Sequence, residues 1–128
     1  MIERPEGKLA WALTELDRDE KWLIEPALSD DDPTGRLWRP GIRVGVQPGS
    51  RFHTEEFFGP VLGIMHAPTL ERAIELQNAV EYGLTAGLHT QDPAELALWL
   101  DRVQAGNLYV NRGITGAIVQ RQPFGGWK

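Results

Sequence analysis

The chain contains no cysteine. These residues therefore hold no disulfide, no thiolate zinc site and no cysteine nucleophile. A basic excess is also missing, because the 128 residues carry a formal net charge of -5. Nucleic-acid binding needs a basic surface that neutralises phosphate, so this composition argues against a nucleic-acid partner. No apolar run approaches the ~20 residues that a membrane-spanning helix requires.

Metal ligands and targeting signals are also scarce. The three histidines, His53, His66 and His89, show no metal-ligand spacing, and we predict no metal site. The start, "MIERPEGKLA", has neither the apolar core nor the cleavage site of a signal peptide. We therefore expect a cytoplasmic chain that forms one domain at most, or part of a larger one.

The N-terminal half predicts a few short elements. Leu9, Leu13 and Leu16 lie on one stripe of a predicted helix over residues 8–18. The acidic stretch "SDDDPTG" is typical of a loop. A strand is expected over residues 41–46, where Ile, Val and Val alternate with Gly, Arg and Gly.

The C-terminal half predicts alternating strands and helices. We expect strands in "VLGIMHA", "YGLTAGLHT" and "NLYVN", separated by two helices. Thr69 is placed to cap the first helix, and Asp92 the second, with Pro93 in its first turn and Glu95 completing a capping box. The order predicts an α/β fold with a βαβαβ parallel sheet. The visible helices are too few to cover both sheet faces, so we expect part of the fold to be missing.

Four motifs carry a resemblance. They are "EEFFGPV", "YGLTAGLHT", "AGNLYVN" and "QPFGGWK". In this order and spacing they resemble the C-terminal half of the aldehyde dehydrogenase superfamily catalytic domain. The flanking stretches "RLWRPGIRVGVQPGSRFHTEEFFGPVLGIM" and "YVNRGITGAIVQRQPFGGWK" are similar to the branch that oxidises L-glutamate γ-semialdehyde, the 1-pyrroline-5-carboxylate dehydrogenases of proline catabolism. Residues 1–128 are then expected to be a C-terminal portion of that domain, truncated at both ends.

The resemblance implies a cofactor contact. In the family, the Glu of the Glu-x-Phe-Gly-Pro motif accepts hydrogen bonds from the nicotinamide ribose of NAD, and the Phe packs beside the nicotinamide. The matching residues are Glu56 and Phe58. A carboxylate suits this role, because it is an acceptor that can take two hydroxyls at once. The alternative is that Glu56 is a solvated loop charge and Phe58 a core aromatic.

The resemblance also implies a substrate anchor. In the glutamate-semialdehyde branch of the family, the loop before Pro-Phe-Gly-Gly binds the α-carboxylate of the substrate through backbone N–H groups, and the matching positions here are Gly116 and Ala117. Consecutive backbone donors in a turn form an anion-binding nest. Phe124 is expected to form part of the apolar wall around the aliphatic part of the substrate. The alternative is a purely structural turn between strands.

Other polar and glycine positions are expected to serve structure. Asn111 is placed to bond backbone groups near a strand end. We expect Gly83, Gly87 and Gly106 to permit turns and close backbone packing. No G-x-G-x-x-G follows a predicted strand, so no dinucleotide cradle is predicted within the chain.

The family's catalytic groups are missing from these residues. Its mechanism needs a cysteine thiolate and a glutamate base, both of which belong to segments upstream. We therefore expect a fragment of an NAD-dependent dehydrogenase for L-glutamate γ-semialdehyde that is not competent alone. Two alternatives remain: a fragment acting on another aldehyde, and an autonomous, non-catalytic binding or oligomerising module. Such a module needs its bare sheet face covered, by self-association or by the missing part of the enzyme.

Overall fold

The computed structural model describes residues 3–115, 118, 120–121 and 125–127. The chain divides into two compact units, Met1–His66 and Ala67–Lys128. We call them the N-terminal unit and the C-terminal unit and describe each by itself.

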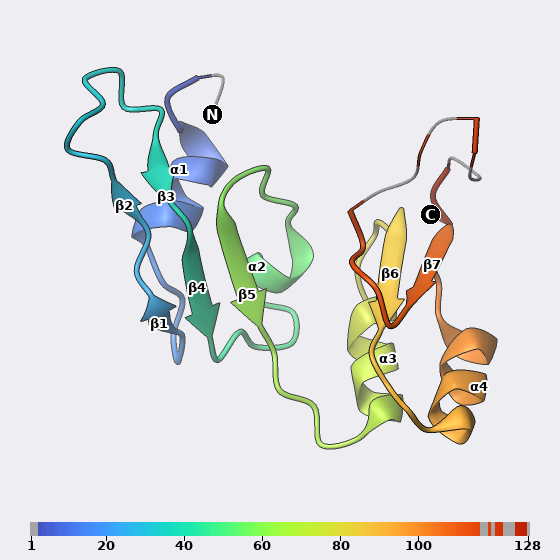
Figure 1. Cartoon of the computed structure of the whole chain (residues 1–128). Coiled ribbons are helices and arrows are strands. Elements are labelled where there is room, and N and C mark those ends of the chain that lie inside the picture. The colour runs from blue at the N-terminus through green and yellow to red at the C-terminus, as the bar shows by residue number, and fades with distance from the viewer. Residues whose placement is uncertain (1–2, 116–117, 119, 122–124, 128) are drawn as a thin grey trace. The chain divides into compact units, whose positions relative to one another are not determined.

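A three-stranded sheet organises the N-terminal unit. It contains β1 (Lys21–Ile24), β4 (Gly41–Val44) and β5 (Val61–Ile64), with β4 in the middle (Figure 1). β1 runs antiparallel to β4, and β5 runs parallel to it. The parallel register places Arg43 of β4 opposite Gly63 of β5. The strand predicted over residues 41–46 is therefore confirmed as β4, two residues shorter at its end.

A hairpin and a short helix complete this unit. β2 (Ala27–Leu28) pairs antiparallel with β3 (Trp38–Arg39). The acidic loop between them is organised by Asp32, whose carboxylate accepts hydrogen bonds from the backbone N–H groups of Thr34, Arg36 and Leu37. These donors hold the pKa of Asp32 well below its usual range, the Thr34 hydroxyl contributing most. The single-turn helix α2 (Arg51–Thr54) lies between β4 and β5.

The first helix is shorter than the sequence predicts. α1 spans Gly7–Thr14, so the prediction that it continues to residue 18 is wrong. Glu15 already has extended backbone. The physical reason is a distant side chain: the Arg43 guanidinium donates to the carbonyls of Ala12 and Glu15 at this end of the helix. These hydrogen bonds satisfy carbonyls that lack partners within the helix. The positive charge of Arg43 at the C-terminal end of α1 also interacts favourably with the helix dipole.

The C-terminal unit contains one complete βαβ crossover. β6 (Thr85–Leu88) and β7 (Asn107–Val110) pair in parallel, and α4 (Pro93–Arg102) connects them. α3 (Leu70–Asn78) precedes β6 and packs against α4. Both predicted caps are confirmed, since the Thr69 hydroxyl accepts from the N–H of Arg72 and the Asp92 carboxylate from that of Ala94. Glu95, however, accepts from the Thr90 hydroxyl rather than from the N–H of Asp92.

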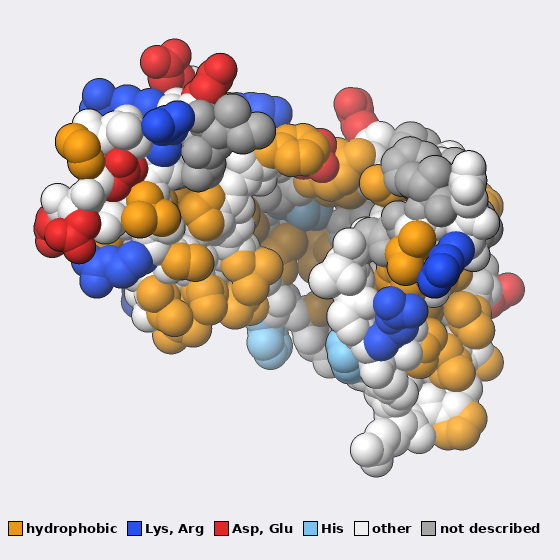
Figure 2. All heavy atoms as spheres, turned by 45° about the horizontal axis from the view of Figure 1, so that its top comes forward, with side chains coloured by type: hydrophobic (Ala, Val, Ile, Leu, Met, Phe, Trp, Pro, Cys, Tyr) orange, Lys and Arg blue, Asp and Glu red, His pale blue; other side chains and the backbone are white. Residues whose placement is uncertain are grey.

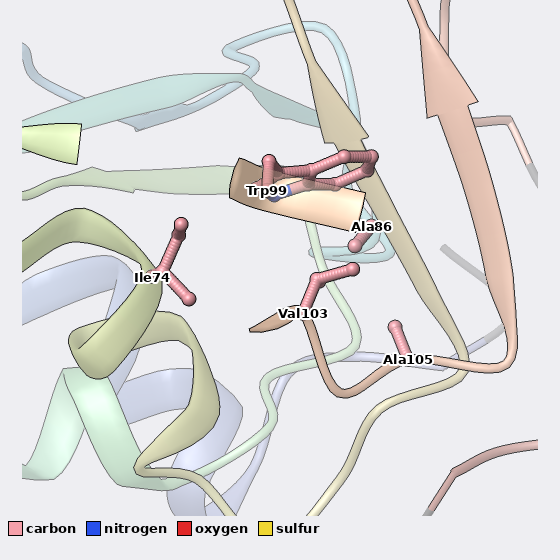
Figure 3. Close-up of a cluster of buried hydrophobic side chains, with 5 residues drawn as sticks. All are labelled: Ile74, Ala86, Trp99, Val103 and Ala105. Atoms are coloured by element: carbon pink, nitrogen blue, oxygen red, sulfur yellow. The ribbon is translucent and has the colours of Figure 1, made fainter. Parts of the chain in front are cut away.

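The core of this unit lies between the two helices and β6. Figure 3 shows its buried side chains: Ile74, Ala86, Trp99, Val103 and Ala105. Trp99 is 1% exposed and is the largest of the fully buried side chains among the described residues. Leu100, the next residue of α4, is 50% exposed.

The α/β class is confirmed, and the strands and helices follow in the predicted order. The strands belong to small sheets, however, rather than to one βαβαβ sheet. Among the described residues, β5 pairs with β4 within the N-terminal unit, and β6 pairs with β7. Apolar side chains reach the surface in both units (Figure 2), among them Leu62 and Ile64 of β5 and Leu108 of β7.

Candidate functional site

The segment Glu55–Pro60 connects α2 to β5 and carries both predicted cofactor residues. Its side chains alternate: Glu55 and Phe57 are partly buried, and Glu56 and Phe58 are exposed. Glu55 has extended backbone at the end of α2. The chain then turns at Phe58, where the N–H of Gly59 donates to the carbonyl of Phe57 at 3.0 Å, and the four side chains differ in burial: two are partly covered and two face solvent. The segment therefore has an inward side and an outward side.

The inward side is held by aromatic packing and an ion pair. The Phe57 ring stacks on Phe52 of α2, with centroids 4.9 Å apart and an interplanar angle of 13°. Trp11 of α1 packs against Phe57 at 5.7 Å. Glu55 pairs with Arg51 at 3.2 Å. These contacts attach the segment to both α1 and α2.

The outward side holds Glu56 and Phe58. Phe58 is 78% exposed, so the interpretation of this ring as a core aromatic is wrong. Phe57, which the sequence did not single out, is the partly buried ring of the segment. Glu56 is exposed and has no hydrogen-bond or ion-pair partner among the described residues. A carboxylate with free lone pairs and an uncovered aromatic ring are therefore two residues apart in the chain, both exposed.

The turn after Phe58 contacts the Leu9 side chain and is hydrogen-bonded to β4. A Cβ on Gly59 would lie 2.2 Å from Cδ1 of Leu9 in α1, so a larger residue there would displace the Leu9 side chain. The carbonyl of Pro60 accepts a hydrogen bond of 2.9 Å from the N–H of Gly41 in β4. The Gly-Pro pair of the motif thus joins the segment to both a helix and the central strand.

Beneath the segment lies Arg43, whose side chain is fully buried. Its guanidinium pairs with Glu20 at 2.7 Å and lies over the rings of Trp11, Trp22 and Phe52 at 5.3, 4.7 and 4.0 Å. Burial lowers the pKa of Arg43, and the negative charge of Glu20 opposes that shift. In the sequence, Arg43 looks like an ordinary polar residue of a strand. The aromatic residues Trp11, Trp22 and Phe52, which lie far from it in the chain, are the signal that could have indicated its burial.

The predicted substrate residues Gly116, Ala117 and Phe124 lie outside the described residues. The described chain on either side of them is anchored within the C-terminal unit. Before them, Asn111 exchanges two hydrogen bonds with the backbone of Thr90, which confirms its structural role. After them, the N–H of Trp127 donates to the carbonyl of Gly83 at 3.0 Å.

Gly83 and Gly106 permit that second anchor. The N–H of Gly106 also donates to the carbonyl of Gly83, at 2.9 Å. A Cβ on Gly106 would lie 1.9 Å from the carbonyl oxygen of Gly125, and one on Gly83 would lie 2.6 Å from that of Gln104. Close backbone packing, predicted for these glycines, is confirmed. The Gly-Gly of the "QPFGGWK" motif thus packs on the turn that precedes β7.

Within the ranges that the structure describes, no group of three or more His, Asp or Glu side chains is arranged to hold a metal ion. Over the same ranges, no helix combines the length and the apolar character that crossing a bilayer demands.

Comparison with known proteins identifies the class to which this fold and these motifs belong. The model of the aldehyde dehydrogenase family matches residues 11–128. The chain belongs to the aldehyde dehydrogenase family. Within that family it is similar to 1-pyrroline-5-carboxylate dehydrogenases. The protein of that name from Bacillus subtilis is 43% identical over 97 residues, which are 76% of this chain and 19% of the relative. The protein of that name from Staphylococcus epidermidis is 39% identical over 105 residues, which are 82% of this chain and 20% of the relative.

Solved structures agree with this similarity. Proline utilization A from Corynebacterium freiburgense matches this chain with a TM-score of 0.94 and 58% sequence identity. The match covers 100% of this chain and 13% of the proline utilization A chain. A 1-pyrroline-5-carboxylate dehydrogenase from Thermus with bound NAD matches with a TM-score of 0.70 and 39% sequence identity. The match covers 74% of this chain and 18% of the Thermus chain. The chain thus spans about a fifth of the length of the curated relatives that it matches.

Proposed function

We propose that this chain is the part of an NAD-dependent L-glutamate γ-semialdehyde dehydrogenase that contacts the nicotinamide half of the cofactor and anchors the substrate. The residues form a C-terminal portion of the catalytic domain, and the enzyme acts in proline catabolism. The observation that carries the proposal is the outward pair Glu56 and Phe58, exposed on a segment that is anchored from below.

The outward pair fits a nicotinamide riboside. Glu56 has free lone pairs, so its carboxylate accepts hydrogen bonds from two ribose hydroxyls. The uncovered ring of Phe58 offers an apolar face beside the nicotinamide. NAD, when bound, supplies the hydride acceptor of the oxidation. The role of Glu56 and Phe58 is to orient it, because a misplaced reactant loses much of the rate that positioning provides.

The substrate role rests on the loop before "QPFGGWK". Backbone N–H groups at Gly116 and Ala117 bind the α-carboxylate of the semialdehyde, and Phe124 lines its aliphatic part. The anchors at Asn111 and Trp127 support this role, because a binding loop needs fixed ends.

The chemical step needs groups from outside these residues. The 128 residues contain no cysteine, so the thiolate that attacks the aldehyde belongs to another part of the enzyme, as does the general base. The isolated chain is therefore expected to show no dehydrogenase activity.

A chimera tests the cofactor role. The 128 residues replace the matching segment of Corynebacterium freiburgense proline utilization A, which is 58% identical over the whole chain. Glu56→Gln in this chimera should raise the KM for NAD about tenfold, because a neutral amide accepts weaker hydrogen bonds than a carboxylate. Glu25→Gln, which removes an exposed carboxylate outside the segment Glu55–Pro60, is the matched control. Equal KM values for Glu56→Gln and the parent chimera would overturn the assignment.

One observation favours the alternative of an autonomous module. Leu62 and Ile64 of the edge strand β5 are 56% and 41% exposed within the chain, and apolar surface of this kind is usually covered. A defined dimer of the isolated chain in sedimentation velocity would support that alternative. Monomer or polydisperse aggregate would count against it.

A further inference from the structure

A column of stacked groups supports the segment that carries Glu56 and Phe58. We propose that Arg43, Phe52 and Phe57, here called the Arg–Phe–Phe column, position Glu56 and Phe58 and thereby set the affinity for NAD. The inference rests on the proposed function, and it assigns three positioning residues that do not touch the cofactor themselves.

The column is continuous from the sheet to the segment. The Arg43 guanidinium lies 4.0 Å from the centroid of Phe52, and Phe52 stacks on Phe57 at 4.9 Å. Phe57 is flanked in the chain by the two proposed cofactor residues, Glu56 and Phe58. A displacement of the Phe57 ring therefore moves both neighbours through the backbone.

The base of the column is immobilised by its contacts. Arg43 is held by the Glu20 carboxylate at 2.7 Å and by the carbonyls of Ala12 and Glu15. These acceptors belong to the end of α1 and the chain that follows it, whereas Arg43 itself lies in the central strand β4. A planar guanidinium with several fixed acceptors has one orientation, which gives Phe52 a fixed surface to pack on.

Two glycines leave room for the column and its segment. Gly63 lies opposite Arg43 in the sheet, and a Cβ there would come within 2.5 Å of the Phe52 ring. Gly59 leaves similar room for Leu9 of α1. The Phe52 ring therefore lies on bare backbone as well as on Arg43, and its position is closely defined.

Glu56 depends on this support, because it has no partner of its own among the described residues. Its position comes from Glu55, paired with Arg51, and from Phe57 in the column. Without the column the segment must be ordered when the cofactor binds, and ordering costs affinity. We expect loss of the Phe57 ring to raise the dissociation constant for NADH about three- to tenfold, a change equivalent to immobilising one or two side chains.

Two matched variants in the chimera test the inference. Phe57→Leu removes the top of the column. Trp22→Leu is the matched variant. It removes the Trp22 ring of β1, which lies 4.7 Å from the Arg43 guanidinium but has no described ring contact with Phe52 or Phe57. Two quantities are measured for each: the dissociation constant for NADH by fluorescence titration, and hydrogen exchange of residues 55–61 without cofactor. Phe57→Tyr, which keeps the ring, provides the rescue.

We expect Phe57→Leu to weaken NADH binding and to speed exchange over residues 55–61, and Phe57→Tyr to restore both. Trp22→Leu should lower the melting temperature but change neither quantity. Equal weakening by Trp22→Leu, or unchanged exchange in Phe57→Leu, would overturn the inference. Glu56→Gln separates the two proposals: if it weakens binding and Phe57→Leu does not, the column is wrong and the proposed function stands. If Glu56→Gln has no effect, both fail.

Discussion

Arg43 and Glu20 form an ion pair of 2.7 Å in which both side chains are fully buried. Two atoms of the pair, Nε of Arg43 and Oε1 of Glu20, have no hydrogen-bond partner among the described residues. Burying a pair of charges costs free energy that their attraction often fails to return, whereas removing one partner is strongly destabilising. The pair therefore fixes how α1, β4 and the start of β1 are arranged. It adds little net stability.

The first prediction tests that balance. Arg43→Met leaves Glu20 buried without a countercharge, so it should lower the free energy of unfolding by about 3–5 kcal/mol. The double variant Arg43→Met/Glu20→Leu removes both charges and should recover a large part of that loss. Urea denaturation of the parent and both variants measures these differences. A double variant as unstable as the single one would show that the pair itself provides the stability.

The second prediction concerns pH. The pKa of Asp32 in the folded chain lies well below its ordinary value of about 3.9. Its contribution to stability is therefore complete above pH ~4 and is lost as the pH falls through the lower folded value. The difference in free energy of unfolding between the parent and Asp32→Asn should shrink below pH ~4. Asp31→Asn, the exposed neighbour, is the control, and an equal pH dependence for both variants would contradict the assignment.

The third prediction concerns the contact between Gly106 and Gly125. Gly106→Ala places a methyl group 1.9 Å from the Gly125 carbonyl oxygen, so the chain must shift. We expect a loss of about 1–3 kcal/mol, typical of overpacking. Gly113→Ala is the control, because a Cβ on Gly113 would lie 4.0 Å from its nearest neighbour, Cγ2 of Thr115. Thermal unfolding of both variants measures the effect, and equal melting temperatures would show that the contact is not tight.

The fourth prediction separates hydrogen bonding from backbone conformation at Asn111. Its side chain makes two hydrogen bonds to the Thr90 backbone, and its φ of 54° lies in the left-handed region. Asn111→Gly removes the hydrogen bonds and should cost about 1–2 kcal/mol. Asn111→Ala adds backbone strain of about 1 kcal/mol and should be less stable still. Urea denaturation gives the order, and a more stable Ala variant would contradict it.

The local features of this fold could be predicted from the sequence. The Thr69 and Asp92 caps need only a hydroxyl or carboxylate next to the first helical N–H groups, so a few residues suffice to predict them. The assignment of Glu56 and Phe58 to the cofactor, which comes from the family motif, stays a prediction.

The features that were missed depend on residues far apart in the chain. The end of α1 at Thr14 depends on Arg43, whose guanidinium satisfies carbonyls 28 and 31 residues earlier. The choice between Phe57 and Phe58 as the buried ring depends on Phe52 and Trp11. Neither periodicity nor motif spacing contains this information, because both describe one segment at a time.

The substrate specificity of the chimera tests the central claim most directly. The quantity is kcat/KM for NAD-dependent oxidation of L-glutamate γ-semialdehyde, compared with that for butanal, which lacks the α-carboxylate and amino group. The account predicts a preference for the semialdehyde of at least about 100-fold, since a site built to bind a charged group strongly rejects an analogue without it. Equal values for the two aldehydes would contradict the account.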